Sequence, residues 1–254
     1  MTIFILFLIF IGIAGGLAWF LVFHDHGEKE PIGALWMALG LGLLGAIPTL
    51  FLERAFVHIH PGITPDLVTL GKTSILIGVI EESCKFLPLA FLIYKRRFFN
   101  EHTDGVVYFA LAGLGFGLPE NIFYTAQFGT GAGVARIFLT PFFHAATTAI
   151  IGYFLVKQKI AGKNALMVAF PLIFMMVVHG LYDFGLMSGR SALSLMSVGI
   201  TFTLSGTLFI LFMKANERDQ DLGLSIVGTN LFCRTCGKAN PKRHLYCTHC
   251  GKNA

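Results

Sequence analysis

Seven apolar runs constrain the fold of this chain more than any other feature of its sequence. They cover approximately residues 3–23, 32–52, 71–94, 105–126, 134–156, 164–187 and 192–213. A helix of about 20 apolar residues crosses the ~30 Å of hydrocarbon in a bilayer. Only 13% of the 254 residues are charged, whereas soluble domains carry about 25%. We therefore expect an all-α polytopic membrane protein with about seven transmembrane helices in residues 1–213, integral to the lipid bilayer.

Lysine and arginine residues predict the orientation of these helices. The loops after the third and fifth runs are rich in them, with Lys95, Arg96 and Arg97 in one and Lys157, Lys159 and Lys163 in the other. The segment before the first run has none, and we assign Arg136 to the poor loop after the fourth run. Because basic loops stay in the cytoplasm, the N-terminus is expected outside and the C-terminus inside. The compact loops fit a bacterial or archaeal cell membrane, and the net charge of +5 makes no strong case for nucleic acid.

Ionisable side chains lie within the apolar runs, where each is costly and by default a candidate for function. They are Glu81, Glu82 and Lys85 in the third run, Glu120 beside Asn121 in the fourth, His144 in the fifth, and His179 and Asp183 in the sixth. Counted along the expected helices, the three glutamates and two histidines lie in one layer ~9–15 Å below the outer surface. The sequence therefore predicts that four helices bring polar groups together.

The spacing of these residues indicates pairs and chemistry. Glu81 and Lys85 are four residues apart, as are His179 and Asp183, so each pair shares a helix face. Glutamate and histidine are ligand types that suit zinc. A divalent metal would activate water for a free glutamate to deprotonate, whereas without metal a buried glutamate could activate water itself. Both alternatives stay open at this point.

Other polar residues are expected to have ordinary roles. Cys84 is interpreted as an apolar residue of its helix, and Asp104 as a helix cap. The residues expected to be solvated at the ends of runs or in loops are His24, Asp25, His26, His58, His60 and His102.

In order and spacing, these motifs resemble the PrsW-type intramembrane proteases, distant relatives of the CAAX-processing membrane endopeptidases. The resemblance covers roughly residues 30–213 and rests on Glu81-Glu82-x-x-Lys85, Phe116-x-x-x-Glu120-Asn121, His144 and His179-x-x-x-Asp183. It implies that Glu81, Glu82, Glu120, His144 and His179 are catalytic and that Lys85, Asn121 and Asp183 support them. It also implies cleavage of a membrane-anchored protein, such as an anti-sigma factor.

The C-terminal tail has its own motif. Cys233-x-x-Cys236-Gly and Cys247-x-x-Cys250-Gly supply four thiolates for a structural Zn²⁺. We expect residues 214–230 to be a linker and residues 231–254 to be a zinc ribbon, which could bind a protein partner.

Two functions other than a protease also fit the buried charges. The chain could be a transporter that couples to protons or metal ions, although it shows none of the inverted repeats that many transporters have. It could also be a non-catalytic membrane adaptor that presents the zinc ribbon, in which case the glutamates would be dispensable.

Overall fold

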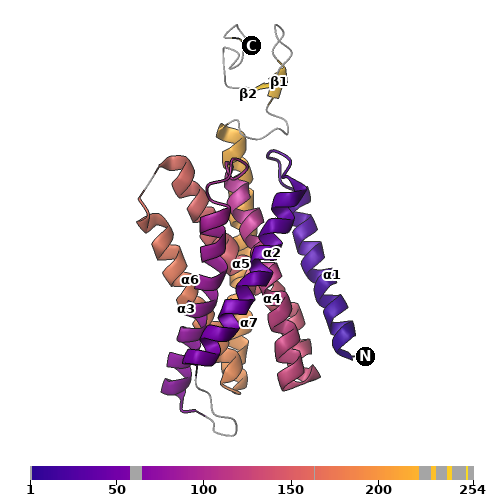
Figure 1. Ribbon diagram of the computed structural model, residues 1–254, viewed down its shortest axis with the longest axis vertical. Helices are drawn as coiled ribbons and strands as arrows, with labels where there is room; N and C mark the ends of the chain where they lie inside the picture. Colours follow the sequence, from indigo (N-terminus) through magenta and orange to yellow (C-terminus); the bar gives the residue numbers. More distant parts are fainter. Residues whose placement is uncertain are drawn as a thin grey trace.

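The computed structural model describes residues 2–57, 65–162, 164–222, 230–232, 239–241 and 250. In these ranges the chain forms seven helices and one short hairpin (Figure 1). The helices are α1 (Thr2–Phe23), α2 (Ile32–Phe56), α3 (Leu67–Leu92), α4 (His102–Phe128), α5 (Thr130–Ala161), α6 (Leu166–Met187) and α7 (Ser191–Leu222). Strands β1 (Asn230–Phe232) and β2 (Ala239–Pro241) pair antiparallel.

The seven helices form one bundle, with the first residues of α1 at one end and the last residues of α7, which precede the C-terminal tail, at the other (Figure 1). Helices α4 and α5 make the centre, because 72% and 83% of the residues in their most apolar stretches are buried, against 22–39% for the other spanning candidates. The outer helices expose large apolar side chains such as Phe51, Phe91 and Phe202. An apolar surface around a buried polar centre is what a lipid solvent requires.

Six of the seven described helices are long and apolar enough to cross a bilayer. Helix α3 is absent from this set although it has 26 residues. It carries Glu81, Glu82 and Lys85 within one turn near its middle, and all three are buried. The prediction of an all-helical integral membrane protein is confirmed, and α3 carries two of the five candidate catalytic residues, Glu81 and Glu82.

Glycine residues bring the central helices close together. A Cβ at Gly113 of α4 would clash with the carbonyl oxygen of His144 in α5. A Cβ at Gly78 of α3 would clash with the carbonyl oxygen of Met176 in α6. Small residues at such crossings let backbones touch. These glycines therefore allow α3 to pack closely on α6, and α4 on α5, beside the candidate residues.

The end of the bundle nearest the tail differs from the prediction in two ways. Helix α7 continues beyond residue 213, where we expected a linker, to Leu222. Its buried Asp219 accepts hydrogen bonds from the backbone N–H groups of His102 (2.8 Å) and Thr103 (2.9 Å), and lies 2.7 Å from Nδ1 of His102. His102 is therefore buried rather than solvated. Asp104 is a capping residue as expected, because its carboxylate accepts from the N–H of Glu101 at 2.6 Å.

Candidate functional site

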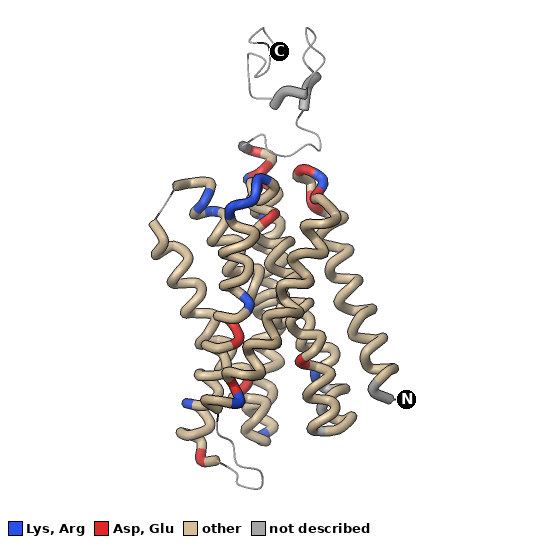
Figure 2. The backbone as a smooth tube through the Cα atoms, viewed as in Figure 1, with Lys and Arg blue, Asp and Glu red and all other residues tan. Residues whose placement is uncertain are grey.

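Charged residues occupy two levels of the bundle. Figure 2 shows one group at the end nearest the tail and a second group inside the lower half, nearer the N-terminus. The second group contains the residues that the sequence singled out. Glu81 and Glu82 come from α3, Glu120 from α4, His144 from α5 and His179 from α6. Glu81, Glu82, His144 and His179 are all at most 3% exposed, so the structure brings the predicted residues together in a nearly dry interior.

Lys85 lies at the centre of this cluster. Its Nζ is 2.9 Å from Oε1 of Glu82, 3.3 Å from Oε2 of Glu81 and 2.7 Å from Nδ1 of His144. The same ammonium lies 4.3 Å from the centre of the Phe116 ring. One cation thus separates two adjacent carboxylates that would otherwise repel each other in a low-dielectric interior. The predicted Glu81–Lys85 pair is present, and Glu82 makes the shorter contact.

Hydrogen bonds to Glu82 fix the orientation of His179. Oε1 of Glu82 lies 2.7 Å from Nδ1 of His179 and accepts from the hydroxyl of Thr147 at 3.2 Å. With Nδ1 donating to Glu82, Nε2 of His179 carries the lone pair and lies 3.4 Å from Oε2 of Glu81. Asp183 lies 3.5 Å from the same Nε2. The tautomer of His179 therefore follows from Glu82 more than from Asp183, which the sequence had paired with it.

Glu120 and His144 form the second half of the cluster. Nε2 of His144 lies 2.6 Å from Oε2 of Glu120, and Arg136 forms an ion pair with the other oxygen of that carboxylate. The guanidinium of Arg136 also lies 4.0 Å from the centre of the Tyr124 ring. Glu120 has a side chain that is 11% exposed, more than those of Glu81 and Glu82. It is the glutamate of the cluster that water reaches most easily.

The structure corrects the assignment of Arg136, which we placed in a loop. It lies in α5, is 7% exposed and pairs with Glu120. A second residue that sequence analysis missed is Glu53, near the end of α2, whose buried Oε1 makes no hydrogen bond within the described residues. A carboxylate directly after the second apolar run (residues 32–52) was the signal that could have drawn attention to Glu53.

Asn121 does not join the cluster. It is buried and lines a small pocket with Leu6 and Phe10 of α1 and Ile137 of α5. Its amide makes no hydrogen bond to the described residues. Consecutive positions on a helix point about 100° apart, so Asn121 faces α1 while Glu120 faces His144.

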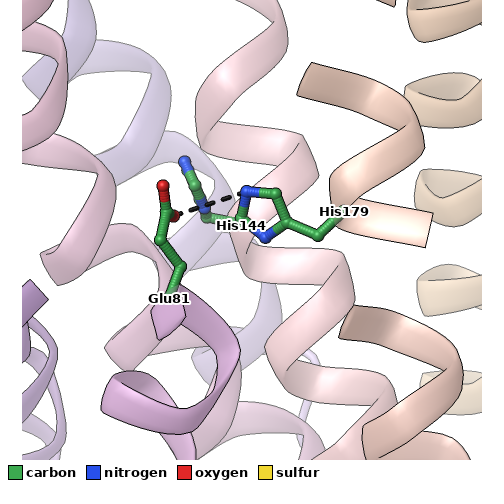
Figure 3. Close-up of side chains that lie close together, drawn as sticks. All are labelled: Glu81, His144 and His179. Carbon is green, nitrogen blue, oxygen red and sulfur yellow. Dashed lines mark ion pairs between the residues drawn. The ribbon is translucent and has the colours of Figure 1, made fainter. Parts of the chain in front are cut away.

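Three residues of the cluster have the donor set of a divalent metal site. Glu81, His144 and His179 each offer a ligand atom, and these atoms lie within 4.8 Å of one another. The three side chains point toward one another from α3, α5 and α6 (Figure 3). Around this position Oε2 of Glu81 lies 3.3 Å from Nζ of Lys85, and Nε2 of His144 lies 2.6 Å from Oε2 of Glu120. A carboxylate on the far nitrogen of a histidine, as Glu82 provides for His179, is the usual support of a metal-binding imidazole. The residues therefore fit a divalent metal.

The predicted zinc ribbon lies mostly outside the described residues. Cys233, Cys236 and Cys247 are not among them, and Cys250 is exposed. The zinc ribbon therefore stays a prediction.

Comparisons with known proteins agree with the geometry. The model of the PrsW family of intramembrane metalloproteases matches residues 30–213. A protein named Protease PrsW from Bacillus subtilis is 30% identical over 177 residues, which cover 68% of this chain and 79% of the relative. Its namesake from Geobacillus kaustophilus is 31% identical over 186 residues, covering 71% and 80%. The namesake from Oceanobacillus iheyensis is 29% identical over 212 residues, covering 81% and 94%. No solved structure matches the chain.

Proposed function

Because the chain belongs to the PrsW family of intramembrane proteases, we propose that the cluster of Glu81, Glu82, Glu120, His144 and His179 is where it hydrolyses a peptide bond. Family membership identifies the chain as a protease rather than a transporter or an adaptor. The observation that carries the proposal is the convergence of Glu81, His144 and His179 within 4.8 Å. Buried polar groups are costly in a membrane and are retained where they function.

Glu81, His144 and His179 would hold a divalent metal, with Zn²⁺ the ion that this donor set suits best. When bound, such an ion supplies Lewis acidity to a carbonyl oxygen and lowers the pKa of a coordinated water. Glu82 keeps His179 in the tautomer that presents Nε2 to this position, since its Oε1 lies 2.7 Å from Nδ1. Lys85 balances the charge of the two adjacent glutamates from 2.9 and 3.3 Å.

Glu120 is the proposed proton acceptor. Hydrolysis requires that the oxygen of water bonds to the scissile carbonyl carbon, that the water gives up a proton, and that the departing amine nitrogen receives one when the C–N bond breaks. The carboxylate of Glu120 lies at the more open side of the cluster and contacts His144 at 2.6 Å. Arg136 fixes its position through the other oxygen. Glu120 would take the proton from water and return it to the amine.

The proposed substrate is a membrane-anchored protein cleaved on the extracytoplasmic side, with anti-sigma-factor-like proteins as one class. The loop between α3 and α4 holds Lys95, Arg96 and Arg97, and Lys159 near the end of α5 contacts the same loop. These residues lie at the end of the bundle where α7 finishes (Figure 1). Since basic loops remain cytoplasmic, the N-terminus would be outside. Arg136, which is buried in α5, no longer counts against this orientation.

We also propose that residues 231–254 form a cytoplasmic zinc ribbon, with Cys233, Cys236, Cys247 and Cys250 as ligands of a structural Zn²⁺ that stays bound throughout the reaction. Metal analysis separates the two proposed sites. Replacing all four cysteines with serine should remove one ion per chain and leave cleavage of a single-span substrate sensitive to chelators. His144→Ala/His179→Ala should remove the other ion and abolish cleavage. A full-length protein that cleaves its substrate with only the ribbon ion bound would refute the metal role of the cluster.

A further inference from the structure

A groove opens between α3 and α6 on the surface that faces lipid. It has a volume of about 590 Å³ and is lined by Val68, Gly71 and Lys72 of α3 and by Gly180, Leu181 and Phe184 of α6, among others. Val68 is 67% exposed and Leu181 is 42% exposed. The groove is therefore accessible from the bilayer, not from the interior of the bundle.

The glycines at the crossing of the two helices give the groove a narrow end and a wide end. At Gly180 an added Cβ would lie 2.6 Å from Cα of Ile75, so the backbones touch there. At Gly71, nearer the start of α3, an added Cβ would lie 4.0 Å from the Phe184 ring. The helices consequently separate toward their Leu67 and Met187 ends.

The narrow end of the groove lies beside the proposed catalytic cluster. Gly180 follows His179 in α6, and a Cβ at Gly78 would lie 3.2 Å from Cβ of His179. Glu81 and Glu82 follow Gly78 within one helical turn. A chain lying in the groove would thus have its inner end beside the cluster.

Among the described residues that line the groove, Lys72 is the one with a charged side chain, and it is exposed. It lies near the beginning of α3, at the wide end, where a long basic side chain can extend toward water. An acidic residue on an occupant at this level would meet Lys72 as a complementary charge.

We propose that this groove is the docking site for the membrane-spanning helix of the substrate, with small residues against Gly71 and an acidic residue near the extracytoplasmic end paired with Lys72. This inference rests on the proposed function, because an intramembrane protease must admit its substrate from the bilayer. Apolar lining, lipid exposure and proximity to the cluster all favour a transmembrane helix. The groove ends at Gly180, which is next to His179 in α6.

The test uses photocrosslinking in liposomes with the full-length Glu82→Gln variant, so that binding is measured without cleavage. A benzophenone amino acid replaces Leu181 in the groove or, as a control, Leu195 on α7, which is 69% exposed. The probe is a biotinylated single-span peptide of leucine and alanine with one glutamate at its extracytoplasmic end. We expect at least tenfold more peptide crosslinked from position 181 than from position 195. Equal yields, or crosslinks from position 181 to lipid alone, would overturn the proposal.

Two substitutions test the fit and the charge. Gly71→Leu should lower the yield from position 181 at least fivefold, because the new side chain fills the groove. Gly199→Leu on α7, where a Cβ meets nothing within 4 Å, should not change it. Lys72→Glu should also lower the yield, and a peptide with lysine in place of its glutamate should restore it. If Gly71→Leu binds like Gly199→Leu, the groove is not the docking site.

The outcome for the groove is separate from that for the catalytic cluster. Crosslinks from position 181 together with no cleavage by the wild-type protein would contradict the proposed function but still support the groove as the docking site. Cleavage of the peptide without crosslinks from position 181 would contradict the proposal that the groove is the docking site. It would still support the cluster as the catalytic site.

Discussion

The contacts of Lys85 predict a measurable coupling between Lys85 and Glu82. Both side chains are at most 1% exposed, and Nζ of Lys85 lies 2.9 Å from Oε1 of Glu82. Lys85→Met would leave two adjacent buried carboxylates without their central cation. Removing one partner of a buried ion pair costs about 3–5 kcal/mol in the free energy of unfolding.

Glu82→Gln removes the charge and keeps an acceptor. The amide oxygen can take the place of Oε1, which contacts Lys85, His179 and Thr147, while Oε2 has no hydrogen bond among the described residues. Two charge-assisted hydrogen bonds become neutral at about 1 kcal/mol each, a loss of about 2 kcal/mol. In the double variant the neutral glutamine at position 82 needs no cation. The loss in the free energy of unfolding should therefore be about 2–3 kcal/mol smaller than the sum of the two single losses.

Reversible unfolding in mixed micelles with increasing dodecyl sulfate, followed by far-ultraviolet circular dichroism, measures these free energies. Lys72→Met is the matched control, because Lys72 is an exposed lysine on the same helix. Its effect should stay within about 0.5 kcal/mol. If the effects of Lys85→Met and Glu82→Gln add to within about 0.5 kcal/mol, the central ion pair described here is wrong.

Three further predictions follow from the packing and from the end nearest the tail. Gly78→Ala should destabilise the fold by about 1–3 kcal/mol, because the added Cβ clashes with α6 backbone; Gly199→Ala, in open space, should be neutral in the same unfolding assay. Burial, followed by the charge of Asp104, raises the pKa of Glu101 from 4.5 to about 8, so folding favours its protonated form. The free energy of unfolding should decrease by up to about 1.4 kcal/mol per pH unit as pH rises from 4.5 to about 8. The melting temperature of Glu101→Gln should depend less on pH than that of the wild-type protein. An unchanged dependence on pH would contradict this assignment. Asp219→Ala should lower the free energy of unfolding by about 2–4 kcal/mol, because it removes hydrogen bonds that cap α4. Glu217→Ala, at an exposed position, should change it little. Equal losses in the two variants would show that Asp219 does not cap α4.

The sequence predicted the helices and the members of the cluster because both depend on local patterns. Apolar run length determines where helices cross a bilayer, and an ionisable residue inside such a run stands out against it. The depth argument worked for Glu81, His144 and His179 because helical rise converts residue number into height.

Pairing between helices could not be predicted in the same way. Arg136 looked like a loop charge because it lies near the start of an apolar run, and its contacts with Glu120 and Tyr124 explain its burial. Asn121 shared the height of Glu120 but not its direction around α4. The last part of α7 has no apolar pattern that would mark it as helix, yet Asp219 binds the start of α4.

The most direct test of the central claim is cleavage of a single-span substrate in liposomes by the full-length protein and by Glu81→Gln, Glu120→Gln and His179→Ala. Glu217→Gln, at an exposed position, serves as the control. The account predicts that the rate falls at least 10²-fold in each cluster variant, that the control keeps the wild-type rate, and that a chelator abolishes wild-type cleavage until Zn²⁺ is restored. Cleavage at the wild-type rate by any of the three cluster variants, each folded as judged by its unfolding curve, would contradict the assignment of the catalytic site.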